Sequence, residues 1–522
     1  MEKRNVVVIG AGNGGIAAAV ALAQQGLQPL VLEKHRLPGG CATSFVRGRF
    51  EFDASIHCLF YGFQGYKDVW EDYMGIDANL EVVKTGVAYS HIGKDGKPVF
   101  IKYSHGDAAF TAEFKKQFPE DAAKIDEFMS IARSFKLAVD TLNSSGVTVD
   151  KTLSKFVAVK DKLGMLALLM KAKKICPDFL KLAKMSIPEF LDAYDMPLSV
   201  RRYVGSLWWY LGDDYNKLPI ARMLGSFYFP IDVPCYFPRN ACHEYLIAME
   251  AKLRELGGEI RYNDEVSEIL TRDGKVVGVK TARGEEIETS YIVSDASAST
   301  VFGKLIKEES PARTKLLDEI NNIPLNGSFA TVYLGLNASC EELGITNHHI
   351  YFTDDDDGAK TWEASKGFSG PYTFGALCPN VTIPDFSPEG TCVLTLTVSI
   401  RPEATEGMSQ RDYAAAKEQF ASDLIDRASY HMNINLRDYI EEIEVMTPVT
   451  LARYANAVGG ALGYSLGAQA KANVKTMVKE AEKSYKGLSF VGQYSPNGIG
   501  YSNSVAGYKH GCHEALVIKE GK

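Results

Sequence analysis

Short runs of aliphatic and β-branched residues predict buried strands near the start of the chain. Residues 5–9 read Asn-Val-Val-Val-Ile, which is typical of a strand covered on both faces in a parallel sheet. Residues 16–25 are rich in alanine and favour a helix, which Gly26 is suited to end. Residues 30–32 repeat the strand pattern. The order strand, helix, strand predicts an α/β fold with a parallel sheet.

Two longer stretches differ in their patterning. Residues 118–229 are mostly helical by pattern, and Ser186 to Glu189 form a capping box with proline in the first turn. Residues 301–445 alternate more between polar and apolar positions, which predicts a sheet with flanking helices. Asp273 and Gly274 predict the turn of a hairpin between two further strands.

Composition and charge argue against several classes of protein: nucleic-acid-binding, zinc-binding, disulfide-rich and membrane-spanning. The 522 residues carry a net charge of −8, so no global basic field attracts nucleic acid. Nine cysteines form an odd set without C-x-x-C spacing, which argues against a zinc site or a disulfide framework and fits a reducing compartment. The longest apolar runs, 16–23 and 165–170, are far shorter than the ~18 residues of a membrane span. We therefore predict no metal, no nucleic-acid partner and no membrane-crossing segment.

The turn between the first strand and the helix carries the candidate chemistry. Residues 10–15 read Gly-Ala-Gly-Asn-Gly-Gly, which is G-x-G-x-x-G in the required position. Gly10 suits a tight turn, Gly12 lets the backbone approach a diphosphate, and Gly15 lets the helix lie close to the sheet. The helix N-terminus offers free N–H groups and a positive dipole end to phosphates. We predict a dinucleotide site that also includes Asn13 and Gly14.

An acidic residue stands at the end of the second strand. Glu33 lies 23 residues after Gly10, and Lys34 follows it. A carboxylate there can accept hydrogen bonds from ribose hydroxyls and repels a 2′-phosphate. The pattern therefore favours FAD or NAD over NADP.

The choice of FAD depends on a resemblance. Gly39 and Gly40 resemble the extended fingerprint of the glutathione-reductase-like FAD superfamily. Residues 39–57 then resemble the "GG … F-D-x-G-x-H" passage of the phytoene desaturase, carotenoid isomerase and retinol saturase family. Cys41 and His57 bring the chain closest to the retinol saturase branch, whereas Ser55 replaces the usual glycine of the family.

Two later blocks resemble the same family. The family residue matching Val266 lies against the adenine through its backbone, and residues 292–296, with Asp295, resemble the strand that returns to the nucleotide site. Residues 488–500, with Gly492 and Gly500, resemble the final flavin motif, which precedes a helix from Ser502. Together, motif and resemblance predict these FAD-binding residues: Gly10, Gly12, Asn13, Gly14, Gly15, Glu33, Lys34, Gly39, Gly40, Cys41, Val266, Asp295, Gly492 and Gly500.

The resemblance implies an α/β protein with a Rossmann-like, discontinuous FAD-binding domain, an α+β substrate domain and a helical lid. We predict the FAD-binding domain in 1–80, 236–300 and 445–522, the substrate sheet in 81–117 and 301–444, and the lid in 118–235.

The resemblance also implies an FAD-dependent oxidoreductase acting on carbon–carbon double bonds of a hydrophobic polyene, isoprenoid or other unsaturated lipid, with reduction favoured. A desaturase and a redox-neutral cis-trans isomerase stay open, as does a lipid or prenyl escort protein without redox activity. The intact glycines argue against the escort protein. The chain has no second glycine motif linked to a strand, so we expect an external electron donor or acceptor.

Three side chains are candidates for catalysis. His57 can donate a proton or position the flavin, since an imidazole titrates near neutrality, although a structural role stays open. Tyr61 and Tyr501 are further candidate donors, or packing residues. Residues 208–210 read Trp-Trp-Tyr and fit either an apolar tunnel or a core.

A lysine-rich segment offers a candidate membrane contact. Residues 155–185 carry eight lysines and two aspartates, a local charge of +6, around an apolar patch at 163–170. Such a segment can lie on an anionic membrane surface or form a solvated helix face over a core. We expect a cytoplasmic protein, with association at the inner face of the membrane as the alternative.

Overall fold

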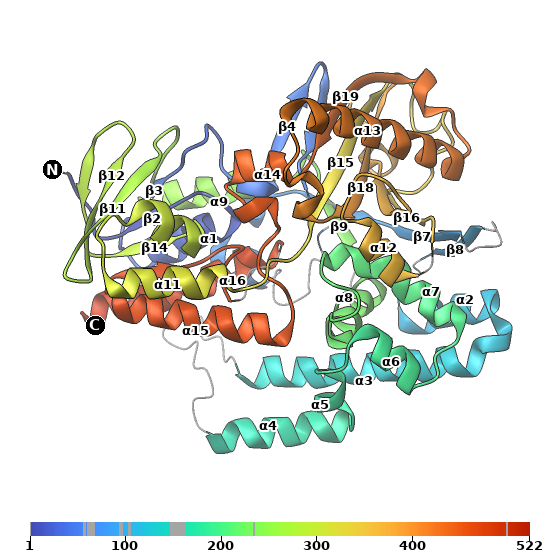
Figure 1. The fold of residues 1–522 in the computed structure, drawn as a ribbon, viewed down its shortest axis with the longest axis horizontal. Coiled ribbons are helices and arrows are strands. Elements are labelled where there is room, and N and C mark those ends of the chain that lie inside the picture. The colour runs from blue at the N-terminus through green and yellow to red at the C-terminus, as the bar shows by residue number, and fades with distance from the viewer. Residues whose placement is uncertain are drawn as a thin grey trace.

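The computed structural model describes residues 2–55, 59, 68–92, 98–102, 106–146, 162–232, 235–355, 357–496 and 500–521. Its elements form three groups: a layered α/β unit that contains both ends of the chain, a large sheet, and a bundle of helices beneath that sheet (Figure 1).

A five-stranded parallel sheet forms the centre of the α/β unit. Its strands run in the order β10-β3-β2-β14-β20, and each neighbouring pair is parallel. The side chains of the four strands from β3 to β20 are buried, as expected for a sheet covered on both faces. Their bounds are β2 Val7–Ile9, β3 Leu30–Leu32, β10 Glu259–Arg261, β14 Ile292–Ser294 and β20 Leu488–Phe490.

Helix α1 (Asn13–Gln24) packs closely against two other helices beside this sheet. These helices are α16 (Ser502–Glu520) and α9 (His243–Glu255). A Cβ added at Gly511 would lie 2.5 Å from the Ala18 carbonyl oxygen, and one at Gly507 would overlap the Gly14 carbonyl oxygen. These two glycines of α16 therefore let the helices approach closely, so that the N-terminus of α16 lies near the start of α1.

A small antiparallel hairpin lies beside the parallel sheet. Strands β11 (Val266–Arg272) and β12 (Lys275–Thr281) pair around Asp273 and Gly274, whose φ angles are 51° and 68°. Two successive positive φ angles are typical of a type I′ turn, as the sequence predicted. Strands β13 (Glu286–Glu288) and β1 (Glu2–Lys3) extend this sheet. Helices α11 (Pro311–Asn321) and α15 (Ala468–Ser484) lie below the α/β unit in Figure 1.

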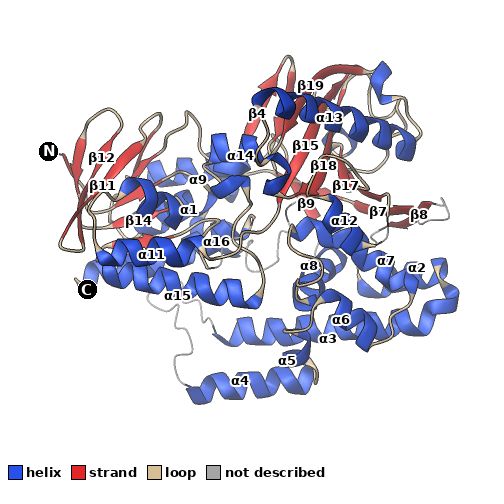
Figure 2. Cartoon of the chain, in the orientation of Figure 1, coloured by secondary structure: helices blue, strands red, loops and turns tan. Residues whose placement is uncertain are grey.

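The second sheet has seven strands in the order β19-β15-β18-β17-β16-β7-β8. Helix α13 (Gln410–Met432) packs against β15 and β18 and covers its upper face in Figure 2, whereas α7 (Leu198–Leu207) contacts β16 and β7. The sheet therefore lies between α13 and the helical bundle. Its strands are β7 Val87–Ile92, β8 Pro98–Lys102, β15 Ser328–Leu336, β16 His349–Thr353, β17 Thr373–Leu377, β18 Cys392–Ile400 and β19 Ile440–Met446.

The helical bundle has an aromatic core that includes Phe110, Phe128 and Tyr203. Ser186 and Glu189 form the predicted capping box at the start of α6, with the Ser186 N–H donating to Glu189 Oε2 at 2.8 Å. Helix α2 packs against α3 and α8 of the bundle and also against β8 of the sheet, to which its residues were assigned from the sequence. The bundle contains α2 Asp107–Gln117, α3 Ala122–Gly146, α4 Lys162–Ile175, α5 Phe179–Leu182, α6 Ile187–Ala193, α7 and α8 Ile220–Asp232.

Short elements connect the three groups. Strands β4 (Ser44–Arg47) and β5 (Phe50–Asp53) form a hairpin, and β6 (Val82–Thr85) pairs with β9 (Cys235–Pro238). The remaining short helices are α10 Ala298–Thr300, α12 Gly358–Ala364 and α14 Pro448–Ala455. Across the described parts of the chain, every helix is too short or too polar to cross a bilayer.

Candidate active site

A cavity of about 320 Å³ lies at the carboxyl ends of β2, β3 and β14, where the three groups of elements meet. Ligands of open parallel sheets bind at this edge, because the loops after the strands diverge there. The walls bring together most of the predicted site residues, namely Gly10, Gly12, Asn13, Gly14, Glu33, Lys34, Gly39, Gly40, Cys41, Val266, Asp295, Gly492, Gly500 and Tyr501.

The glycine loop forms the floor of the cavity. Gly10 has a φ of 95°, which an L side chain rarely adopts. Gly15 lies behind the cavity, where an added Cβ would overlap the Gly10 carbonyl oxygen. The Gly39 N–H donates to the Ala11 carbonyl oxygen at 2.8 Å, so the predicted second glycine pair lies directly beside the loop.

Glu33 connects the glycine loop, residues 10–15, to the end of β3 through hydrogen bonds. Its side chain is buried, and Oε2 accepts a hydrogen bond of 2.7 Å from the Ala11 N–H while Oε1 accepts one of 2.8 Å from the His35 N–H. A carboxylate oxygen can accept more than one hydrogen bond, so Glu33 can hold the loop and still accept from a ribose hydroxyl.

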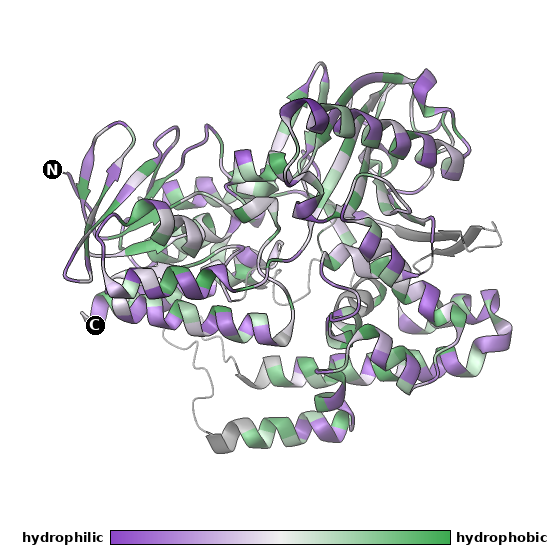
Figure 3. Cartoon of the chain, viewed as in Figure 1, coloured by the Kyte–Doolittle hydropathy of each residue, from purple (hydrophilic) through white to green (hydrophobic). Residues whose placement is uncertain are grey.

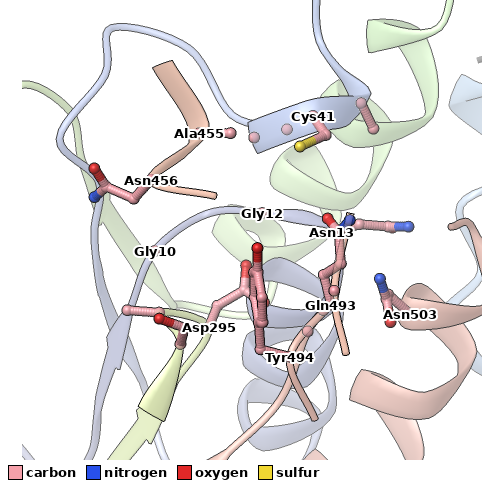
Figure 4. A pocket seen from close by; sticks show the side chains of 18 of the residues that line it. Gly10, Gly12, Asn13, Cys41, Asp295, Ala455, Asn456, Gln493, Tyr494 and Asn503 are labelled. Carbon is pink, nitrogen blue, oxygen red and sulfur yellow. The ribbon is translucent and has the colours of Figure 1, made fainter. Parts of the chain in front are cut away.

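Asp295 follows β14 and lies among the loop glycines (Figure 4). A Cβ added at Gly12 would overlap Asp295 Oδ2, and one at Gly492 would overlap Asp295 Oδ1. Burial, with the charge of Glu33, raises the pKa of Asp295 to about 7, although N–H groups of Gly12 and Gly15 favour the carboxylate.

Two asparagines face the cavity from the N-termini of α1 and α16 (Figure 4). Asn13 Nδ2 donates to the carbonyl oxygens of Gly500 and Tyr501 at 3.3 Å, which joins the two helix ends. The Oδ1 atoms of Asn13 and Asn503 are buried and have no hydrogen-bond partner within the described residues. Buried acceptors need donors, and N–H and O–H groups of a bound ligand can supply them.

These features fit the predicted FAD. The glycine loop and the α1 N-terminus offer a place for a diphosphate, Glu33 and Val266 lie where the adenosine is expected, and the unpartnered amide oxygens can accept from the flavin end. We name Gly10, Gly12, Glu33, Asn13 and Asn503 as the residues that would hold the cofactor.

The far wall of the cavity is apolar and aromatic. Tyr210 and Leu211 belong to the short 3-10 helix Trp208–Leu211, and Phe329 lies on β15. Trp208 and Trp209 pack in the core of the bundle, whereas Tyr210 lines the cavity. The aromatic run therefore serves both roles that the sequence left open.

The Tyr501 hydroxyl contacts a buried polar network that contains Cys242, Asp53 and Ser44. Its Oη lies 3.6 Å from Cys242 Sγ, and the Cys242 N–H donates to Asp53 Oδ1 at 2.7 Å. Ser44 Oγ donates to the same Asp53 oxygen at 2.6 Å. Burial raises the pKa of Tyr501 well above its usual value, so the hydroxyl keeps its proton, and raises the pKa of Asp53 to about 6. His57 and Tyr61 lie outside the described residues.

Sequence reasoning missed part of the lining. Tyr454, Asn456, Leu462 and Tyr464 come from α14 and the following loop, where no regular pattern marked them. Tyr494 could have been predicted as a lining residue from the sequence, because it lies just after β20 within the predicted flavin motif at 488–500.

Comparison with known proteins gives a consistent result. Residues 8–74 match a family model described as an NAD(P)-binding Rossmann-like domain. The chain is 26% identical over 475 residues to a chloroplastic prolycopene isomerase of Daucus carota, covering 88% of this chain and 71% of that protein. It is 23% identical over 485 residues to an all-trans-retinol 13,14-reductase of Danio rerio, covering 88% and 77%.

The predicted resemblance to the carotenoid isomerase and retinol saturase family is confirmed. A solved structure of a redesigned putrescine oxidase covers all of both chains with a TM-score of 0.65 at 13% identity. That likeness concerns the fold alone. With the matched Rossmann-like region, it confirms the predicted fold class.

Proposed function

We propose that this protein is an FAD-dependent oxidoreductase that reduces a carbon–carbon double bond in a hydrophobic polyene, isoprenoid or other unsaturated lipid. The observation that carries the proposal is the continuity of one cavity, from the glycine loop to the apolar wall of Tyr210, Leu211 and Phe329. An apolar chain placed against that wall would lie beside the cofactor, sheltered from water.

Different residues of the chain bind the cofactor, orient the substrate and donate the proton. FAD, when bound, supplies the hydride chemistry at its ring N5. The glycine loop and Glu33 anchor the cofactor, and the aromatic wall orients the substrate. Tyr501 Oη is our candidate proton donor, because the hydroxyl keeps its proton and Tyr501 lines the cavity. The reducing electrons come from an external donor.

A second candidate is a redox-neutral cis-trans isomerase, which the similarity to prolycopene isomerases favours. Anaerobic incubation of the dithionite-reduced protein with unsaturated lipids separates the two. A product about 2 Da heavier, from two added hydrogens, supports reduction, and a product of unchanged mass with altered geometry supports isomerisation. Loss of two hydrogens from the substrate, when it is incubated with the oxidised protein and a quinone as electron acceptor, supports the reverse desaturase reaction.

We further propose that α4 and the adjacent residues contact an anionic membrane surface. Leu166 and Met170 on α4 are 57% and 64% exposed, and Lys171, Lys173 and Lys174 on the same helix are exposed. Figure 3 shows hydrophobic and hydrophilic residues along this helix. Basic and apolar side chains on one exposed helix favour the interface of an anionic bilayer. In this proposal the protein is cytoplasmic, docks on the inner face of the membrane and takes its lipid substrate from that bilayer. Residues 155–161 of the predicted segment lie outside the described residues.

A further inference from the structure

Asp295 occupies the space that the loop glycines leave open. Gly12 and Gly492 cannot carry a Cβ without overlapping its carboxyl group, and a Cβ at Gly10 would lie 3.3 Å from Asp295 Cβ. The glycines therefore make room for a protein carboxyl group as well as for a diphosphate.

The position of this carboxyl group creates an electrostatic conflict. It accepts hydrogen bonds from the N–H groups of Gly12 and Gly15, at the N-terminus of α1. The same helix end is where the glycine motif holds a diphosphate. Two anions at one helix terminus repel each other, and the repulsion disfavours the ionised form of the weaker acid. A diphosphate is the stronger acid of the two, so the carboxyl group is the one that changes its charge.

The surroundings of Asp295 do not relieve this conflict. The titratable groups that act on it are Glu33, from the end of β3, and Cys41, from the short helix Gly40–Ala42. Glu33 is a further carboxylate, and burial raises the pKa of Cys41 to about 11, so this thiol is neutral. Lys34 lines the same cavity, but burial lowers its pKa, and Glu33 is the acidic group that acts on it most strongly. Asp295 itself has a raised pKa of about 7, within reach of physiological pH.

We propose that Asp295 takes up a proton when FAD binds, and that the neutral acid then acts as a hydrogen-bond donor beside the diphosphate. This inference rests on the proposed FAD site. The consequence is a proton-linked cofactor affinity: FAD is held more tightly in neutral or mildly acidic solution than in alkaline solution. Release of one proton per site weakens binding by at most about tenfold per pH unit.

Titration of the full chain with FAD from pH 6 to pH 9, followed by flavin fluorescence, tests the inference. We expect the dissociation constant of the unsubstituted protein to rise about 10- to 30-fold between pH 7.5 and pH 9. Asp295→Asn keeps a neutral donor of nearly the same shape, so its dissociation constant should change less than about threefold over that interval. Glu482→Gln is the matched control, because Glu482 also has a pKa of about 7 but lies on α15 outside the cavity wall. It should keep the profile of the unsubstituted protein.

Calorimetry in two buffers of different ionisation enthalpy counts the protons directly and needs no variant. We expect net proton uptake on FAD binding near pH 7.5, and its loss in Asp295→Asn. A flat affinity profile without proton uptake, or an unchanged profile in Asp295→Asn, overturns the inference. Failure of the protein to bind FAD at every pH would instead reject the proposed function.

Discussion

The Glu33 carboxylate accepts a hydrogen bond from the Ala11 N–H at 2.7 Å, which links the end of β3 to the glycine loop across the cofactor cavity. One side chain thereby fixes both the loop expected to hold a diphosphate and the position expected to hold a ribose. The two halves of the dinucleotide site are coupled through this buried carboxylate.

Replacing Glu33 with Ala should weaken FAD binding about 10- to 100-fold, because hydrogen bonds to a charged acceptor contribute about 1.5–3 kcal/mol. The Ala11 and His35 N–H groups would also lose their acceptor. Glu33→Gln keeps one amide oxygen and should lose less. Equilibrium dialysis with FAD measures both variants, and equal affinity of Glu33→Ala and the unsubstituted protein contradicts the assigned role.

Replacing Gly12 with Ala should weaken FAD binding about tenfold or more, because the new Cβ overlaps Asp295 Oδ2 and forces this carboxyl group to move beside the expected diphosphate. Gly367→Ala is the control, since an added Cβ there meets nothing within 4 Å and the backbone is not strained. Flavin absorbance per protein after purification gives the readout. A Gly12→Ala protein that is folded by circular dichroism and saturated with flavin would contradict the role of the glycine loop in holding FAD.

Replacing Tyr501 with Phe should lower turnover at least about tenfold while the protein keeps its flavin, because the hydroxyl beside Cys242 is the proposed donor. Tyr508→Phe on the same helix is the control, since its hydroxyl donates to Gln24 Oε1 away from the cavity. Product formation by the reduced protein is measured for both. Equal turnover of all three proteins would exclude Tyr501 as the donor.

Much of the cofactor site could be predicted from the sequence, because its signals are local. The strand–glycine–helix order and the β11–β12 turn each depend on neighbouring residues, and the structure contains both; the same holds outside the site for the capping box of α6. The role of Asp295 was harder to predict. Its contacts with Gly12 and Gly492 join three distant parts of the chain, and the sequence alone gave only a position near the nucleotide.

The substrate side was less predictable for the same reason. Strand β7 pairs in parallel with β16, and helix α2 contacts both β8 of the sheet and helices α3 and α8 of the bundle. Neither result follows from periodicity, which reports which face of an element is buried but not its partner. Tyr210 illustrates the limit: it lines the cavity while its neighbour Trp209 is buried in the core.

Replacing Leu166 and Met170 together with Glu should reduce binding to anionic vesicles about tenfold or more, since burial of each apolar side chain contributes about 1.5–3 kcal/mol. The exposed Ile443 on β19 offers a control, Ile443→Glu, which should bind as the unsubstituted protein does. Co-sedimentation with vesicles rich in phosphatidylserine measures all three. No binding by the unsubstituted protein removes the membrane proposal without affecting the cofactor site.

Glu514→Gln should raise the thermal midpoint at pH 8.5 by about 1–3 °C. Burial, together with Glu482, raises the pKa of Glu514 from its ordinary value of 4.5 to about 7. The folded state therefore binds more protons than the unfolded state between these values, and stability falls as pH rises through them. The gain should vanish below pH 4.5, where both states are protonated. Differential scanning fluorimetry across pH tests this, and a destabilised variant at pH 8.5 contradicts it.

The most direct test of the account is the flavin content of the purified protein. We predict visible flavin absorbance and the release of one FAD per chain on denaturation, identified by mass. Colourless protein that binds neither added FAD nor FMN would contradict the assigned cofactor cavity, and with it the proposed chemistry.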